Sequence, residues 1–101
     1  MTRPDILPEI AAERARQDAK WGEQNHPDGT GMLGDLGRAN RAKMACNSAA
    51  SNGTLTYRHI LDEEVREAFA EYDPAKLRAE LVQVAAVAVA WIECIDRRGG
   101  R

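Results

Sequence analysis

The fold is decided by residues 61–83, whose sequence is LDEEVREAFAEYDPAKLRAELVQ. Asp is a strong helix N-cap and Pro is favoured at the first helical position, so Asp73-Pro74 ends one helix and begins another. Residues 58–98 are therefore predicted to form a helical hairpin. If its helices are antiparallel, Glu67 and Glu80 lie at matching heights, six residues before Asp73 and seven after it.

The hairpin brings acidic side chains together. Glu64 and Glu67 share one helix face, about 4.5 Å apart along the axis, and Glu64 is expected to face Gln83. Three carboxylates and a carboxamide would then converge. Such a cluster raises its own pKa values unless a cation occupies it, and Mg²⁺ or Mn²⁺ prefers oxygen ligands of this kind.

Length and composition limit the function. The chain has 101 residues, which indicates a single domain over 1–101, and 14 basic against 16 acidic side chains, which gives no sign of nucleic-acid binding. Cys46 and Cys94 do not form the spacing of a disulfide framework, and we find no signal peptide. The most apolar run, residues 81–92, is too short for a membrane span. A cytoplasmic protein that binds no membrane is predicted.

Apolar spacing predicts an all-α fold of four helices. The first helix is expected from Pro4 to Lys20, followed by a surface loop over residues 21–31. The second is expected from Leu33 to Ser51, the third after an N-cap within residues 54–56, and the fourth from Pro74 to about Arg98. No stretch alternates for long enough to be a strand.

The fourth helix predicts a homo-oligomer. Two apolar stripes together occupy most of the circumference of this helix, so other parts of the protein must bury most of its surface. In so short a chain, the cover is expected to include a second copy. The main stripe consists of Leu77, Leu81, Val84, Ala88, Trp91 and Ile95, and the second of Val82, Ala85, Val89 and Ile92.

The motifs resemble those of a known family. The acidic pattern is Glu63-Glu64-x-x-Glu67 followed by Glu80-x-x-Gln83; residues 56–61 (TYRHIL) and 16–24 (RQDAKWGEQ) extend the likeness. Together they resemble the MazG-like all-α nucleoside triphosphate pyrophosphohydrolases, in the short form found in phages and actinobacteria. The resemblance implies a four-helix MazG-like bundle that oligomerises through its C-terminal helices as a homodimer or homotetramer. It also implies hydrolysis of an NTP or dNTP to the monophosphate and pyrophosphate with Mg²⁺ or Mn²⁺.

The resemblance and the residues together give a set of candidate roles. The metal ligands would be Glu64, Glu67, Glu80 and Gln83. Glu63 and Glu64 are the candidate catalytic residues, which with the metal would make a water molecule nucleophilic. The candidates for binding the nucleotide are Gln17, Lys20, Trp21, Gln24 and Lys43.

Gln83 departs from the family pattern, in which the fourth ligand is usually Asp. Glu63 could compensate for the missing charge, the metal could keep an extra water, or the protein could bind a nucleotide without hydrolysing it. A third hypothesis is a helical dimer with a solvated acidic face, neutralised by salt bridges from Arg66, Lys76 or Arg78.

Several other residues have two interpretations each. Trp21 could stack on a nucleobase or anchor its loop. The basic side chains of Arg38, Arg41 and Lys43 could contact phosphate or form a solvated basic face. His59 is assigned a local hydrogen bond rather than the role of a base. His26 could contact phosphate or metal or remain a solvated loop residue.

Overall fold

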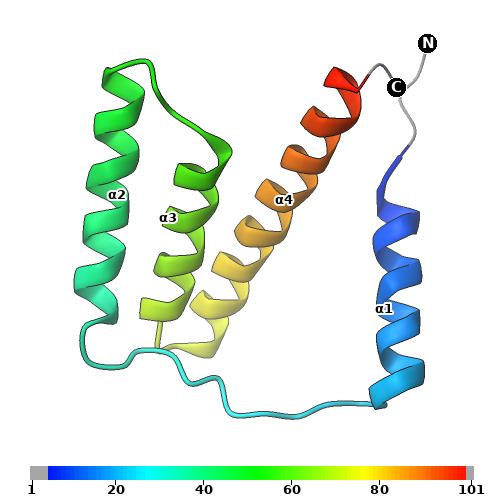
Figure 1. Ribbon diagram of the computed structural model, residues 1–101. Helices are drawn as coiled ribbons and strands as arrows, with labels where there is room; N and C mark the ends of the chain where they lie inside the picture. The colour runs from blue at the N-terminus through cyan, green and yellow to red at the C-terminus, as the bar shows by residue number, and fades with distance from the viewer. Residues whose placement is uncertain (1–4, 100–101) are drawn as a thin grey trace.

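The computed structural model describes residues 5–99, and within that range it contains four helices and no strand. They are α1 (Leu7–Trp21), α2 (Asp35–Ser51), α3 (Tyr57–Ala70) and α4 (Pro74–Arg98) (Figure 1). The all-α fold class is confirmed. None of these helices combines the length and the apolar character needed to cross a membrane.

Capping residues fix the ends of the predicted hairpin. The Thr56 hydroxyl accepts a hydrogen bond from the backbone N–H of His59 at 3.2 Å, and the His59 ring accepts one from the backbone N–H of Thr56 at 3.1 Å. This reciprocal capping box begins α3 and gives His59 the local role predicted for it. At the turn, Asp73 accepts from the backbone N–H of Lys76 at 3.0 Å, and Pro74 is the first residue of α4. The hairpin and its break are confirmed.

Two predicted helix ends differ from the observed ones. The loop was expected to begin at Trp21, but α1 includes this residue and ends where Gly22 takes a φ of 70°. The second helix begins at Asp35 rather than Leu33, because Gly34 has a φ of 89° and the Asp35 carboxylate accepts from the backbone N–H of Met32 at 2.9 Å. Pro4, the predicted start of the first helix, lies outside the described residues.

Helices α2, α3 and α4 pack side by side with α3 in the middle (Figure 1). Small side chains allow the close approach: Ala39, Ala42 and Ala49 are buried on α2, and Ala68 on α3 is only 1% exposed. At the far end of the hairpin, Tyr57 stacks on Trp91 with ring centroids 5.7 Å apart. The predicted core residue Trp91 is half-buried. The result is a flat molecule of 43 × 42 × 19 Å.

Helix α1 stands apart from the other three (Figure 1). Among the described residues it makes no extensive contact with α2, α3 or α4, and none of its own residues is buried. The connecting segment is tied to the hairpin where the Gly31 N–H donates to the Phe69 carbonyl at 2.8 Å. A Cβ on Gly31 would lie 2.9 Å from the Tyr72 ring, so this position requires glycine. One chain therefore has the four helices but does not close them into a bundle.

Candidate metal centre

Three glutamates converge across the hairpin at the end near its turn. Glu64 and Glu67 lie one turn apart on α3, and Glu80 lies on α4. One carboxylate oxygen from each lies within 4.8 Å of the others, and all three residues are half-buried. The predicted convergence of Glu64, Glu67 and Glu80 is confirmed. We call these three residues the acidic triad.

The triad is electrostatically strained when no cation is present. Burial raises the pKa of Glu67 to about 7, with further contributions from a hydrogen bond with Glu63 and from the charges of Glu64, Glu63 and Glu80. The pKa of Glu64 is also raised, first by burial and then by repulsion from Glu80 and Glu63. Both pKa shifts arise because loss of solvent on burial and nearby negative charges each disfavour the charged form of a carboxyl group.

Basic side chains do not relieve this repulsion. Arg66, which follows Glu64 by two positions, points to Asp62 and pairs with it at 3.3 Å. Within residues 5–99, no ion pair reaches Glu64, Glu67 or Glu80. The alternative in which Arg66, Lys76 or Arg78 neutralises the triad by a salt bridge is therefore wrong for the described residues.

The donor set fits a hard divalent cation. Mg²⁺ binds oxygen at 2.0–2.1 Å, so two oxygens on one octahedral ion are separated by about 4.2 Å at most. The triad oxygens lie within 4.8 Å of one another, which small side-chain rotations can reduce to that separation. Three carboxylates supply up to three negative charges, and half-burial leaves room for water as the remaining ligands.

A groove beside the triad connects it to α2. It has a volume of about 250 Å³, and Glu67 and Glu80 form part of its wall together with Lys43 and Asn40 from α2. Lys43 was a sequence candidate for phosphate binding, and the structure brings it to the same groove as two triad members. Arg38 and Arg41 line a different hollow on the opposite side of α2, so they are separated from the triad groove.

Glu63 links the triad to a residue that sequence reasoning did not select. The pKa of the Cys46 thiol on α2 is raised, first by hydrogen bonding with the Glu63 carboxylate, then by burial and by the negative charges of Glu63 and Glu64. Glu63 therefore acts on the pKa values of both Cys46 and Glu67. The spacing of Asn40, Lys43 and Cys46 at three-residue intervals could have indicated that one face of α2 meets the acidic helix.

Gln83 lies on α4 almost one turn after Glu80 and is exposed. Its amide makes no hydrogen bond with the described part of the chain. Nothing in the arrangement ties Gln83 to the triad, and its role as a fourth ligand stays a prediction.

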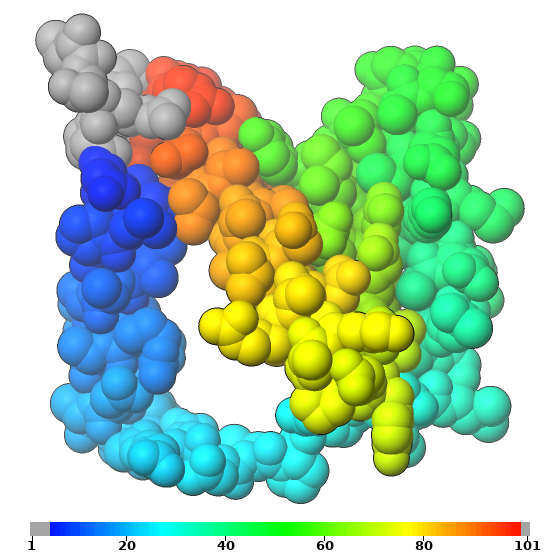
Figure 2. Space-filling view, turned by 180° about the vertical axis from the view of Figure 1, so that it is seen from behind, coloured from blue at the N-terminus to red at the C-terminus, as the bar shows by residue number. Residues whose placement is uncertain are grey.

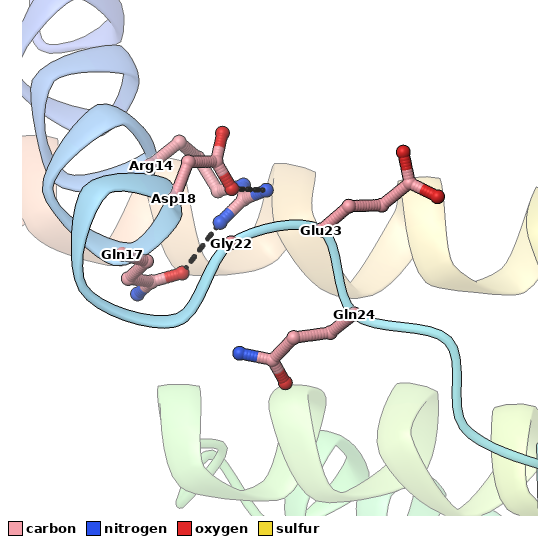
Figure 3. A pocket seen from close by; sticks show the side chains of 6 residues that line it. All are labelled: Arg14, Gln17, Asp18, Gly22, Glu23 and Gln24. Carbon is pink, nitrogen blue, oxygen red and sulfur yellow. Dashed lines mark hydrogen bonds and ion pairs between the residues drawn. The ribbon is translucent and has the colours of Figure 1, made fainter.

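Two of the nucleotide-binding candidates line a second hollow. Gln17 on α1 and Gln24 just after it border a space of about 590 Å³ at the C-terminal end of α1, where Arg14 donates to Gln17 at 2.7 Å (Figure 3). Lys20 and Trp21 do not line this hollow. Lys20 places its ammonium 4.7 Å from the centre of the Trp21 ring. This hollow and the triad groove share no lining residue, so a single chain does not bring Gln17 and Gln24 into one pocket with the candidate metal ligands.

No protein-family model, curated protein or solved structure matches this chain. The chemistry of the site therefore has to be derived from its own side chains. They comprise a half-buried carboxylate triad, an adjoining carboxylate at Glu63 and a lysine across the groove.

Proposed function

We propose that the protein is a metal-dependent pyrophosphohydrolase that converts an NTP or dNTP to the monophosphate and pyrophosphate, as the resemblance to the MazG-like family implies. The proposal rests chiefly on the acidic triad, whose oxygens lie within 4.8 Å of one another without a basic partner. Carboxylates that repel each other in this way are stabilised by a divalent cation, and triphosphates are commonly bound through one.

Each residue of the groove has a distinct role in this proposal. Glu64, Glu67 and Glu80 would hold the cation, while Glu63, one turn before Glu67 on α3, would accept a proton from the attacking water. Lys43 contributes a positive charge for the phosphates from the opposite wall of the groove. A bound Mg²⁺ or Mn²⁺ would neutralise charge on the phosphate oxygens and lower the pKa of a bound water.

A second candidate function is nucleotide binding without hydrolysis. Gln83 is neutral where the family pattern has an acid, and its side chain is exposed. A site with one charge fewer would hold the cation more weakly while still binding triphosphate.

The test is pyrophosphate release from a panel of nucleoside triphosphates in Mn²⁺ and in Mg²⁺. Wild type should release pyrophosphate, and Glu67→Gln should reduce turnover at least about 100-fold by removing one ligand charge. Asp62→Asn is the matched control, because it makes the same chemical change on α3 at an exposed residue outside the triad. Turnover that survives Glu67→Gln would refute the proposal. Nucleotide binding without turnover would favour the second candidate.

A further inference from the structure

A hollow between α2 and α3 gathers arginine side chains from both helices. It has a volume of about 270 Å³, and its wall includes Arg38 and Arg41 from α2 and Arg66 from α3. We call it the arginine hollow. Asp62 and two alanines complete the wall, and the short alanine side chains leave room beside the arginines. Pockets for small molecules generally begin at about 300 Å³, so this hollow suits a group smaller than a whole drug-sized ligand.

The arginine hollow carries an excess of positive charge. Arg38 pairs with Asp35 at 2.9 Å, and Arg66 pairs with Asp62 at 3.3 Å. Arg41 is exposed and makes no ion pair or hydrogen bond within the described residues. The protein therefore neutralises two of the three arginines itself and leaves the guanidinium group of Arg41 able to bind an anion from outside.

The two paired arginines keep donors that an anion can use. Arg38 donates to Asp35 through one terminal nitrogen, and Arg66 donates to Asp62 through Nε. A guanidinium group has five N–H donors, so each of these bonds uses only part of the group. The pKa of Asp35 is lowered first by hydrogen bonding with Arg38, and the charge of Arg66 also contributes. Arg66 of α3 therefore acts across the gap between the two helices.

The arginine hollow is separate from the acidic triad. The groove of Glu67 and Glu80 takes Lys43 from the other side of α2, and the two spaces share no lining residue. Figure 2 shows α1 and α2 at opposite edges of the molecule, and these two helices make no extensive contact. The described part of α1 therefore leaves the arginine hollow open to solvent.

We propose that the arginine hollow binds the phosphate group of a second ligand and needs no divalent cation to do so. The planar fork of arginine matches phosphate oxygens and can donate to two of them at once. A phosphate monoester offers three terminal oxygens to the three guanidinium groups, whereas a carboxylate offers only two. This ligand is distinct from the nucleotide of the proposed function, and the proposal does not depend on that function.

A smaller hollow next to this one distinguishes the possible sources of the phosphate group. It shares Asp62 with the arginine hollow, has a volume of about 230 Å³ and is lined by Leu61, Val65 and Trp91 together with Arg58. An organic phosphate could place an apolar ring against these side chains, whereas inorganic phosphate has no group to place there. The relative affinities of the two kinds of ligand therefore identify the source.

The test is calorimetric titration of the metal-free protein with inorganic phosphate, pyrophosphate and adenosine monophosphate as separate probes. EDTA keeps the triad free of cations, so its carboxylates repel an anion, and about 0.15 M NaCl screens the long-range attraction between exposed charges. We expect one anion to bind per chain. Arg41→Gln should weaken this binding at least about 10-fold, because it removes the unpaired guanidinium group.

Arg78→Gln is the matched control and should bind the probes like wild type. Arg78 is also an exposed helical arginine without an ion pair in the described residues, and it does not line the hollow. Arg41→Lys keeps the charge but loses the fork, so its affinity should lie between those of wild type and Arg41→Gln. Far-UV circular dichroism checks that each variant is folded.

The proposal is overturned if wild type binds none of the three probes, or if Arg41→Gln binds them as wild type does. Equal losses in Arg41→Gln and Arg78→Gln would also overturn it, because they would indicate attraction to net charge alone. Loss of binding in Lys43→Gln would place the anion in the triad groove instead. Tighter binding of adenosine monophosphate than of inorganic phosphate, lost in Arg41→Gln, would support the proposal and identify an organic phosphate as the ligand.

Discussion

Replacing Glu67 by Gln should stabilise the metal-free protein at pH 8 and leave its stability at pH 4.5 almost unchanged. The pKa of Glu67 is raised from 4.5 to about 7 in the folded protein, so the folded state binds this proton more tightly than the unfolded chain does. The free energy of unfolding therefore falls as the pH rises from 4.5 to about 7 and then levels off. The substitution Glu67→Gln removes this titrating carboxyl. The amide that replaces it can still donate a hydrogen bond to Glu63, as the protonated carboxyl does.

The size of the effect follows from the same pKa. A difference between 4.5 and about 7 sets an upper limit of about 3 kcal/mol on the stability lost above pH 7. Glu67 is only half-buried and shares its repulsion with Glu64 and Glu80, so solvent screening and coupling reduce this value. We expect Glu67→Gln to raise the free energy of unfolding at pH 8 by on the order of 1–2 kcal/mol.

The assay is urea unfolding followed by far-UV circular dichroism, in EDTA and at one fixed protein concentration, from pH 4.5 to 8. Asp62→Asn is the control: it removes the exposed pair with Arg66 and should lower stability by about 1 kcal/mol or less. A Glu67→Gln protein that is no more stable than wild type at pH 8 would refute the account of a self-repelling triad. So would a wild type whose stability does not fall between pH 5 and 7.

Three further outcomes are expected. Millimolar Mg²⁺ or Mn²⁺ should raise the Tm of wild type by several degrees at pH 8 and by less at pH 6, because protons compete with the metal for Glu67 at the lower pH. The same ions should not raise the Tm of Glu80→Gln, and equal shifts in both proteins would exclude the triad as the binding site. Gln83→Asp should tighten Mn²⁺ binding measured by calorimetry, because an anionic oxygen replaces a neutral one, and unchanged affinity would place Gln83 outside the coordination sphere. Thr56→Ala should cost about 1 kcal/mol in thermal unfolding by removing the cap of α3, while Thr56→Ser should retain most of it.

Local chemistry explains why the hairpin was predictable. The Asp73-Pro74 pair both caps and starts α4, and Thr56 caps α3, so each end is set by residues within one turn of it. Once those ends are fixed, the antiparallel arrangement brings Glu80 to the height of Glu64 and Glu67. The triad could therefore be located by counting residues from the break.

Helix starts after glycines were harder to place. Gly34 adopts a positive φ, and the Asp35 side chain caps the turn before α2, so apolar spacing alone placed the start two residues too early. Glycine permits several backbone conformations, and which one it takes depends on the contacts around it.

By itself, the sequence determined four helices, the break at residue 73 and an acidic cluster across it, because helix periodicity and capping act over a few residues. Only the tertiary structure decided that Lys43 and Cys46 of α2 meet the acidic helix, that Arg66 turns away to Asp62, and that α1 stands apart. These placements depend on how separate helices pack and on where the Gly-rich segment between α1 and α2 is anchored. Such contacts between distant parts of the chain leave no local period in the sequence from which to predict them.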